Sequence, residues 1–94
     1  MEPNATIEHV PGREFRIDVE GHRSVLEYSM SHGRMVIVHT GVPAALRGRG
    51  IAAQLVQAAF EHARAAGLKV VPRCSYAAAW IERHREYADV VAGD

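Results

Sequence analysis

Apolar and polar side chains alternate along the first third of the chain, and this period of two predicts β-strands. In the segment EFRIDVEGH, Phe15, Ile17 and Val19 fall on one face, while charged residues fall on the other. A strand with one polar face is half-buried in a sheet. A Gly-His pair then predicts a hairpin turn, and RSVLEYSM continues the alternation over residues 23–30.

A third apolar run, at residues 35–38, does not alternate. It reads Met-Val-Ile-Val, which is typical of a central strand covered on both sides. A Ser-His-Gly break precedes it, so short turns are expected to join the three strands into an antiparallel meander. Residues 1–12 show little periodicity and are expected to form a loose N-terminal start.

The pattern becomes helical after a Gly-Val-Pro break at residues 41–43. Apolar residues recur at every fourth position from Ile51, which predicts a helix over residues 50–65 that Gly67 terminates. The segment LKVVP predicts a short strand, and SYAAAWIERHREY predicts a second helix that Ser75 can cap. A strand, a helix and a strand in this order form a βαβ unit, whose two strands are parallel.

These elements define an α/β fold, a mixed sheet in which an antiparallel meander is followed by β-α-β-α. The chain has 94 residues, of which 48% are hydrophobic and 23% charged, so we expect one domain, residues 1–94, with a modest core. On the second helix, Ala78, Trp80 and Ile81 are expected to face inward. The core residues predicted from the other elements are Phe15, Ile17, Leu26, Ile37, Leu55, Val56, Phe60 and Val70.

The composition narrows the classes of function. The 11 basic and 11 acidic residues cancel, which argues against a nucleic-acid partner and confines any anion site to a local cluster. Six histidines are scattered without a metal-binding spacing and Cys74 is the single cysteine, so we expect neither a metal site nor an internal disulfide. The start of the chain lacks a signal-peptide pattern, and no apolar run approaches the roughly 20 residues of a membrane span. These features favour a cytoplasmic protein without a membrane partner.

The segment ALRGRGIAAQL combines arginines and glycines at a strand-to-helix junction. A helix start has backbone N–H groups without intrahelical partners and a partial positive charge, so it can bind an anion. Gly48 and Gly50 leave these groups open and permit positive φ, while Arg47 and Arg49 supply charge and directed donors. The pattern favours a pyrophosphate site that is neither a P-loop nor a dinucleotide fingerprint. The alternative is a plain glycine turn with solvated arginines.

The segment VPAALRGRGIAAQLV resembles the acetyl-CoA signature of the Gcn5-related N-acetyltransferases, Arg/Gln-x-x-Gly-x-Gly/Ala, with Arg47, Gly50 and Ala52 at the three motif positions. The order of the predicted elements also matches the core of that family. The resemblance implies that backbone N–H groups of this loop hold the pyrophosphate of coenzyme A, and that the preceding strand pairs with the pantetheine arm. The residues that it implies for binding acetyl-CoA are Val38, Thr40, Val42, Arg47, Gly48, Arg49, Gly50, Ile51 and Ala52.

Two further segments, HTGVPAALRGRGIA and KVVPRCSYAAAWIERHREY, resemble a subgroup of very small members, the YjdJ-like or NATD1-like domains. The likeness covers residues 14–91 and includes the His-Thr and Pro-x-Cys features of that subgroup. It implies a bare acetyl-CoA-binding core without the N-terminal helices that shape the acceptor site in longer relatives. Many longer relatives use a tyrosine on the last helix as a proton donor, and here Trp80 and Ile81 occupy that place.

His39 and Cys74 are the candidate catalytic residues. They follow two neighbouring parallel strands, and ligands of open α/β sheets collect at the carboxyl ends of strands, so both are expected to flank the thioester. Cys74 also precedes a helix start, which lowers the pKa of a thiol, and it could accept the acetyl group or donate a proton to coenzyme A. The alternatives are a small buried hydrophobe for Cys74 and a strand-end histidine for His39. Glu27 is a candidate base or a solvent-facing residue.

The sequence therefore predicts an acetyl-CoA-dependent N-acetyltransferase that acts on a small amine or an exposed lysine, with the identity of the acceptor left open. The alternative is a coenzyme A-binding module or sensor without transferase activity, because the acceptor-binding elements of longer relatives are missing. Transfer to assorted amines, or hydrolysis of the thioester, would distinguish the two.

Overall fold

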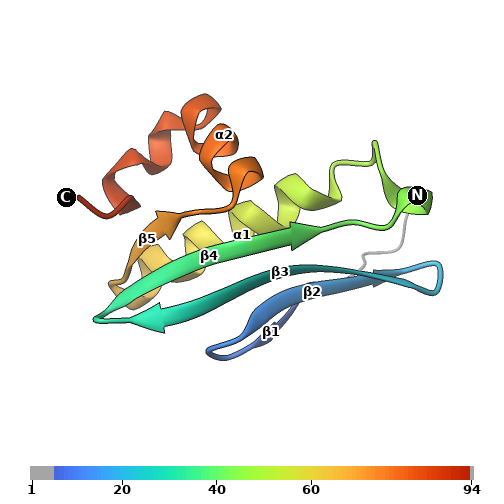
Figure 1. Cartoon of the computed structure of the whole chain (residues 1–94), viewed down its shortest axis with the longest axis horizontal. Coiled ribbons are helices and arrows are strands. Elements are labelled where there is room, and N and C mark those ends of the chain that lie inside the picture. The colour runs from blue at the N-terminus through green and yellow to red at the C-terminus, as the bar shows by residue number, and fades with distance from the viewer. Residues whose placement is uncertain (1–5, 94) are drawn as a thin grey trace.

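The computed structural model describes residues 6–93, which form one mixed sheet with helices on one side (Figure 1). The strand order is β1-β2-β3-β4-β5, with antiparallel pairs from β1 to β4 and a parallel pair between β4 and β5. This arrangement confirms the predicted α/β fold, an antiparallel meander followed by β-α-β-α. The strands are β1 (Glu8–Val10), β2 (Glu14–Val19), β3 (His22–Ser31), β4 (Arg34–Gly41) and β5 (Lys69–Pro72), and the helices are α1 (Ile51–Ala66), α2 (Ser75–Arg83) and the 3-10 segments η1 (Ala44–Leu46) and η2 (Arg85–Val90).

The hairpins of the meander close through two-residue turns. Glu20 and Gly21 link β2 to β3 with φ of 52° and 79°, and His32 and Gly33 link β3 to β4 with φ of 52° and 77°. Positive φ at both central residues defines the type I′ turn, whose twist matches that of the strands it joins. The first turn lies one residue earlier than the predicted Gly-His pair, because the histidine already belongs to β3.

Helix α1 covers one face of the sheet and closes the core. Gly50 at its start and Gly67 at its end both have left-handed backbone, with φ of 77° and 73°, and the Gly67 N–H bonds the carbonyls of Ala63 and Arg64. The helix therefore ends at the glycine that the sequence predicted. The core residues predicted from the strands and from α1 are at most 4% exposed: Phe15, Ile17, Leu26, Ile37, Leu55, Val56, Phe60 and Val70.

Helix α2 and the segment η2 pack beside α1 on the same side of the sheet. The ring centroids of Phe60 in α1 and Trp80 in α2 are 5.4 Å apart, and that of Tyr87 in η2 lies 5.9 Å from Phe60. Trp80 and Ile81 are buried, as predicted. These aromatic contacts anchor the end of the chain on the core.

Two strand predictions are corrected by the structure. Residues 8–10, inside the stretch expected to be loose, form β1 and pair with β2, since a three-residue strand is too short to show a period. Residues 1–5 lie outside the described residues. β4 is buried on one side only, because Val36 is half-buried and Val38 is 49% exposed, so its apolar run is not covered twice.

The second helix differs from its prediction at both ends. Ser75 is its first residue rather than its cap, because Cys74 holds the cap position, and no side chain caps the helix. The helix stops after Arg83, and the chain tightens into η2. Within the helix, Ala77 is fully buried in place of Ala78, which is half-buried.

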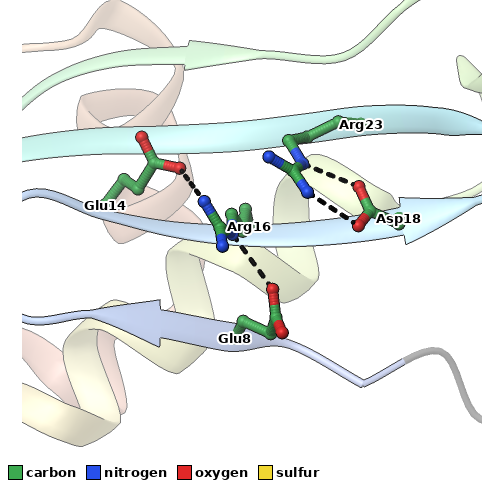
Figure 2. Close-up of polar contacts among 5 residues, drawn as sticks. All are labelled: Glu8, Glu14, Arg16, Asp18 and Arg23. Atoms are coloured by element: carbon green, nitrogen blue, oxygen red, sulfur yellow. Dashed lines mark hydrogen bonds and ion pairs between the residues drawn. The ribbon is translucent and has the colours of Figure 1, made fainter.

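The sheet face opposite α1, which we call the open face, carries charged side chains. In Figure 2, Arg16 binds Glu8 and Glu14 with N–O distances of 3.0 and 3.4 Å, and Arg23 binds Asp18 at 2.8 Å, while α1 lies behind the strands. The Arg16–Glu8 and Arg23–Asp18 pairs each join two neighbouring strands. Since α1 and α2 both pack on the other side, these polar residues remain in contact with solvent.

Candidate active site

A β-bulge lies near the end of β4. Tyr28 of β3 faces Ile37, but the preceding residue, Glu27, faces His39, so Val38 is the extra residue in β4. Strict alternation would place His39 on the buried side with Ile37, whereas the bulge turns it to the open face beside Glu27. Bulges often re-aim a side chain next to a functional site in this way.

β4 and β5 separate at the bulge. Their pairing ends at Ile37 and Pro72, and the N–H groups of Arg73 and Cys74 both donate to the Ile37 carbonyl at 3.0 Å, which turns the chain away from β4. Within the described part of the chain, residues 38–41 continue β4 with no strand on their β5 side. Their backbone N–H and C=O groups on that side can bond an extended ligand that carries amides.

The loop between β4 and α1 forms a pocket. Gly48 and Gly50 have φ of 83° and 77°, and these left-handed conformations bend the chain into the start of α1. Gln54 makes the first bond of the helix, to the Gly50 carbonyl at 3.1 Å, so the N–H groups before it can serve an anion. A cavity of about 240 Å³ opens here, lined by Val42, Leu46, Arg47, Gly48, Gly50, Ile51, Ala52 and Tyr76.

The two arginines of the loop point to different places. Arg47 lines the cavity, and its Nε donates to the carbonyl of Val42 at 3.3 Å. Arg49 points to the β2–β3 turn, where its guanidinium donates two hydrogen bonds to the carboxylate of Glu20, at 3.0 and 3.2 Å. These hydrogen bonds hold the pKa of Glu20 below its ordinary value. Arg49 therefore fastens the loop to the meander, and only Arg47 belongs to the cavity wall.

Cys74 lies at the start of α2 and contacts β4. Its Sγ donates a hydrogen bond to Oγ1 of Thr40 at 3.5 Å. Burial raises the pKa of the thiol. Hydrogen bonds that the thiolate accepts from the Thr40 hydroxyl and from the N–H groups of Ala77 and Tyr76 outweigh burial, so the pKa lies below its ordinary value. A thiol in such a place ionises more readily than an ordinary cysteine.

His39 and Cys74 have different neighbours on β4. His39 faces Glu27 across the bulge, and its Nε2 lies so close to Gly41 that an added Cβ there would come within 3.0 Å of it. Cys74 instead contacts Thr40, the next residue along β4. Because side chains alternate along a strand, that of Thr40 points away from the open face. Within residues 6–93, no hydrogen bond joins His39 to Cys74. The structure thus brings together Cys74 with Thr40, and His39 with Glu27.

The remaining candidates for acetyl-CoA binding lie in two adjoining places, and sequence reasoning missed one residue there. Val38 and Thr40 lie on the free segment of β4, and Arg49 lies in the loop but points to Glu20. Tyr76, which the sequence did not assign to the site, is 41% exposed and lines the cavity. The sequence did place Tyr76 in the first turn of a helix that follows a strand, and this position could have marked it as a site residue. The predicted residues that line the cavity are Val42, Arg47, Gly48, Gly50, Ile51 and Ala52.

Other titratable groups have structural partners. Nδ1 of His84 lies 2.8 Å from the carbonyl oxygen of Trp80, and Nε2 of His9 lies 2.5 Å from the hydroxyl of Tyr28. Across residues 6–93, histidine, cysteine and acidic side chains form no group of three or more that could hold a metal ion. In the same residues, no helix is long and apolar enough to cross a membrane.

Comparisons with known proteins establish the family. The family model described as GCN5-related N-acetyl-transferase matches residues 14–90, and the chain belongs to this family. Among solved structures, the chain is similar to a GCN5-like candidate N-acetyltransferase from Staphylococcus aureus, whose structure was determined in solution by NMR. The two are 32% identical, with a TM-score of 0.75, and the match covers 99% of this chain and 93% of that one. The family resemblance and the fold predicted from the sequence are therefore confirmed.

Proposed function

We propose that this chain is an acetyl-CoA-dependent N-acetyltransferase. Its membership of the GCN5-related family supports acetyl transfer in general. The observation that carries the proposal is the continuity between the cavity at the start of α1 and the free segment of β4, residues 38–41, that leads to it. The cavity suits a pyrophosphate and the free strand edge suits an arm with amide groups, and coenzyme A contains both.

In this proposal, the pyrophosphate is bound at the start of α1. The backbone N–H groups of residues 48–52 donate to it, and Arg47 adds a charged donor from the cavity wall. The pantetheine arm is bound along Val38, Thr40 and Val42 by strand-like hydrogen bonds. Arg49 keeps the loop in place through its ion pair with Glu20.

Acetyl transfer needs a base for the attacking amine and a proton for the departing sulfur. The amine nitrogen attacks the thioester carbonyl carbon, the C–N bond forms, and the C–S bond breaks. Cys74, with its lowered pKa and its hydrogen bond to Thr40, can supply the proton that the sulfur takes up. As a thiolate it could instead accept the acetyl group first and pass it to the amine. His39, on the open face, can accept the proton that the amine loses.

The proposal also places the chain among the small YjdJ-like or NATD1-like members of the family. The His-Thr-Gly sequence at residues 39–41 supports this placement. The cysteine at the start of α2 supports it as well. Members of this subgroup are a bare acetyl-CoA-binding core, and on this proposal the sheet contributes to binding the acceptor.

Two measurements on the purified chain test the proposal. Calorimetry with coenzyme A measures cofactor binding, and the release of free coenzyme A from acetyl-CoA, with and without a mixture of primary amines, measures transfer. An acetyltransferase binds coenzyme A and releases it in an amine-dependent way. Binding without amine-dependent release would identify the module or sensor, and the absence of binding would exclude both functions.

Cys74→Ala tests the assignment of the proton donor. General acid–base help is worth about 100- to 10,000-fold in rate, so the variant should lose turnover of that order while its affinity for coenzyme A stays unchanged. Mass spectrometry of the wild type with acetyl-CoA distinguishes the two roles of the thiol, because only the covalent route leaves an acetyl group on Cys74. Full turnover of Cys74→Ala would return Cys74 to a packing role.

A further inference from the structure

We propose that Glu27 binds the ammonium group of an aliphatic primary amine on the open face and presents it beside His39. The inference rests on the proposed acetyltransferase function and names the substrate class of that site. That class comprises alkylammonium ions, including short alkyl amines and lysine side chains, in preference to uncharged aromatic amines. The strand register around the bulge carries the inference.

The register sets Glu14, Glu27 and His39 in one row across three strands. Glu14 of β2 faces Glu27 of β3, and Glu27 faces His39 of β4. Directly opposed residues of an antiparallel pair point to the same face, with Cβ atoms about 4.5 to 5.5 Å apart. Glu27 and His39 therefore project from neighbouring strands onto the same face, to which the bulge has turned the imidazole.

Glu27 is the carboxylate of this row that lacks a cation. Arg16 is shared by Glu8 and Glu14, and Arg23 is occupied by an aspartate of β2 (Figure 2). Within the described residues, no hydrogen bond or ion pair involves Glu27. A charged acceptor supplies the missing partner, because an ammonium that donates to a carboxylate forms one of the stronger hydrogen bonds of proteins.

Valine side chains flank the row. Val25 and Val36 are half-buried strand residues on either side of it, and Val38 at the bulge is 49% exposed. Val25 faces Gly41, which has no side chain, so the His39 ring has room to lie there. A surface that combines valines with one unpaired carboxylate suits a methylene chain that ends in an ammonium group, because the chain buries apolar area while the charge is paired.

This placement also orders the proton transfers. Glu27 holds the ammonium ion, and the neutral imidazole of His39 accepts one proton from its nitrogen. The freed lone pair then forms the C–N bond as the C–S bond of the thioester breaks. The acetyl group moves from sulfur to nitrogen, and the nitrogen loses two protons in all: the first stays on the imidazole, and the second leaves to water as the amide forms. The sulfur takes its proton from Cys74, which is left as a thiolate, so atoms and charges balance.

The test compares wild type and Glu27→Gln with two acceptors at neutral pH: n-butylamine, which is cationic, and aniline, which is neutral. Glu27→Gln should lower kcat/KM for butylamine about tenfold, mainly by raising KM. This factor corresponds to the weak end of the range for hydrogen bonds to charged groups, because Glu27 is exposed to solvent. Its kcat/KM for aniline and its Kd for coenzyme A should stay unchanged. Glu27→Asp, which keeps the charge, should retain more activity than Glu27→Gln. Glu82→Gln removes an exposed carboxylate on α2 and should match the wild type.

The outcomes separate this inference from the function on which it rests. Equal kcat/KM for butylamine in wild type and Glu27→Gln overturns the role of Glu27 and leaves the acetyltransferase function standing. If the wild type binds coenzyme A but acetylates neither probe, butylamine is added to that complex and followed by amide NMR. Shifts at Glu27 and His39 that Glu27→Gln abolishes support the acceptor site, and their absence overturns it. Failure to bind coenzyme A, seen without any amine, is the failure of the proposed function.

Discussion

Gly50→Glu tests the cofactor site against a control that the fold itself supplies. Gly50 and Gly33 both have φ of 77°, and a Cβ added at either would meet no atom within 4 Å. Glutamate at either position therefore carries a similar strain of left-handed backbone, about 1 to 2 kcal/mol, and adds the same charge. The two differ in place, because Gly50 lines the cavity at the start of α1 and Gly33 lies in the β3–β4 turn.

The loss of affinity follows from the charge at the helix start. A carboxylate at residue 50 can occupy the N–H groups that a pyrophosphate needs, and it also repels the pyrophosphate. A charge at a helix N-terminus is worth up to about 2 kcal/mol, so Gly50→Glu should raise the Kd for coenzyme A by about 30-fold before any steric block is counted. Gly33→Glu should leave this Kd unchanged.

Calorimetry and urea unfolding are measured on the same preparations. Both variants should lose similar amounts of stability, with a slightly smaller loss in Gly50→Glu because a negative charge at a helix start is favourable. Only Gly50→Glu should lose affinity for coenzyme A. Equal Kd values in the wild type and both folded variants would refute the assignment of the pyrophosphate to this loop.

Three further changes probe the core, the thiol and the C-terminal segment. Phe60→Ala should cost about 3 to 5 kcal/mol in urea unfolding, because the ring is fully buried against Trp80 and Tyr87, and an unchanged free energy of unfolding would contradict the packing of α1. Thr40→Val removes a hydrogen bond that stabilises the Cys74 thiolate, so the pH midpoint of thiol alkylation should rise. An unchanged midpoint would contradict a role for that hydrogen bond. Tyr87→Phe removes the hydroxyl that donates to Glu61 at 2.7 Å and holds the pKa of that carboxyl below its ordinary value. A carboxyl group whose pKa is lower in the folded than in the unfolded state stabilises the fold above the unfolded-state pKa, and this stabilisation is lost on acidification. The wild type should therefore be more stable than Tyr87→Phe by about 1 kcal/mol at neutral pH, and this difference should disappear in acid.

The long elements were predictable because each repeats its pattern over many residues. β2 and β3 show the alternation of a half-buried strand, and α1 shows an apolar stripe between two glycines whose positive φ marks its ends. β1 has three residues and no pattern of its own, so only its pairing with β2 defines it. The second helix was overextended because an apolar stripe does not show where a helix tightens into η2.

The loop motif was predictable as a motif, but the tasks of its arginines were not. Arg47 and Arg49 have equivalent settings in the sequence, each followed by glycine. Their difference depends on Glu20, which lies 29 positions before Arg49 and reaches it only after the meander has folded. Arg47 therefore supplies the positive charge that lines the cavity, while Arg49 holds the loop in position through its hydrogen bonds to Glu20.

The bulge explains why His39 and Cys74 could not be placed relative to each other from the sequence. In a regular strand, His39 would share the buried side with Met35 and Ile37 and approach the start of α2. One extra residue, Val38, reverses which side of the sheet the following residues face. Thr40 therefore lies within hydrogen-bond distance of Cys74, while His39 pairs with Glu27 in the strand register. A single inserted residue leaves no mark on the apolar pattern, because the run at residues 35–38 is apolar throughout. If His39 and Cys74 both act in acetyl transfer, they act from opposite sides of β4. His39 then accepts a proton from the amine, and Cys74 donates a proton to the sulfur of coenzyme A.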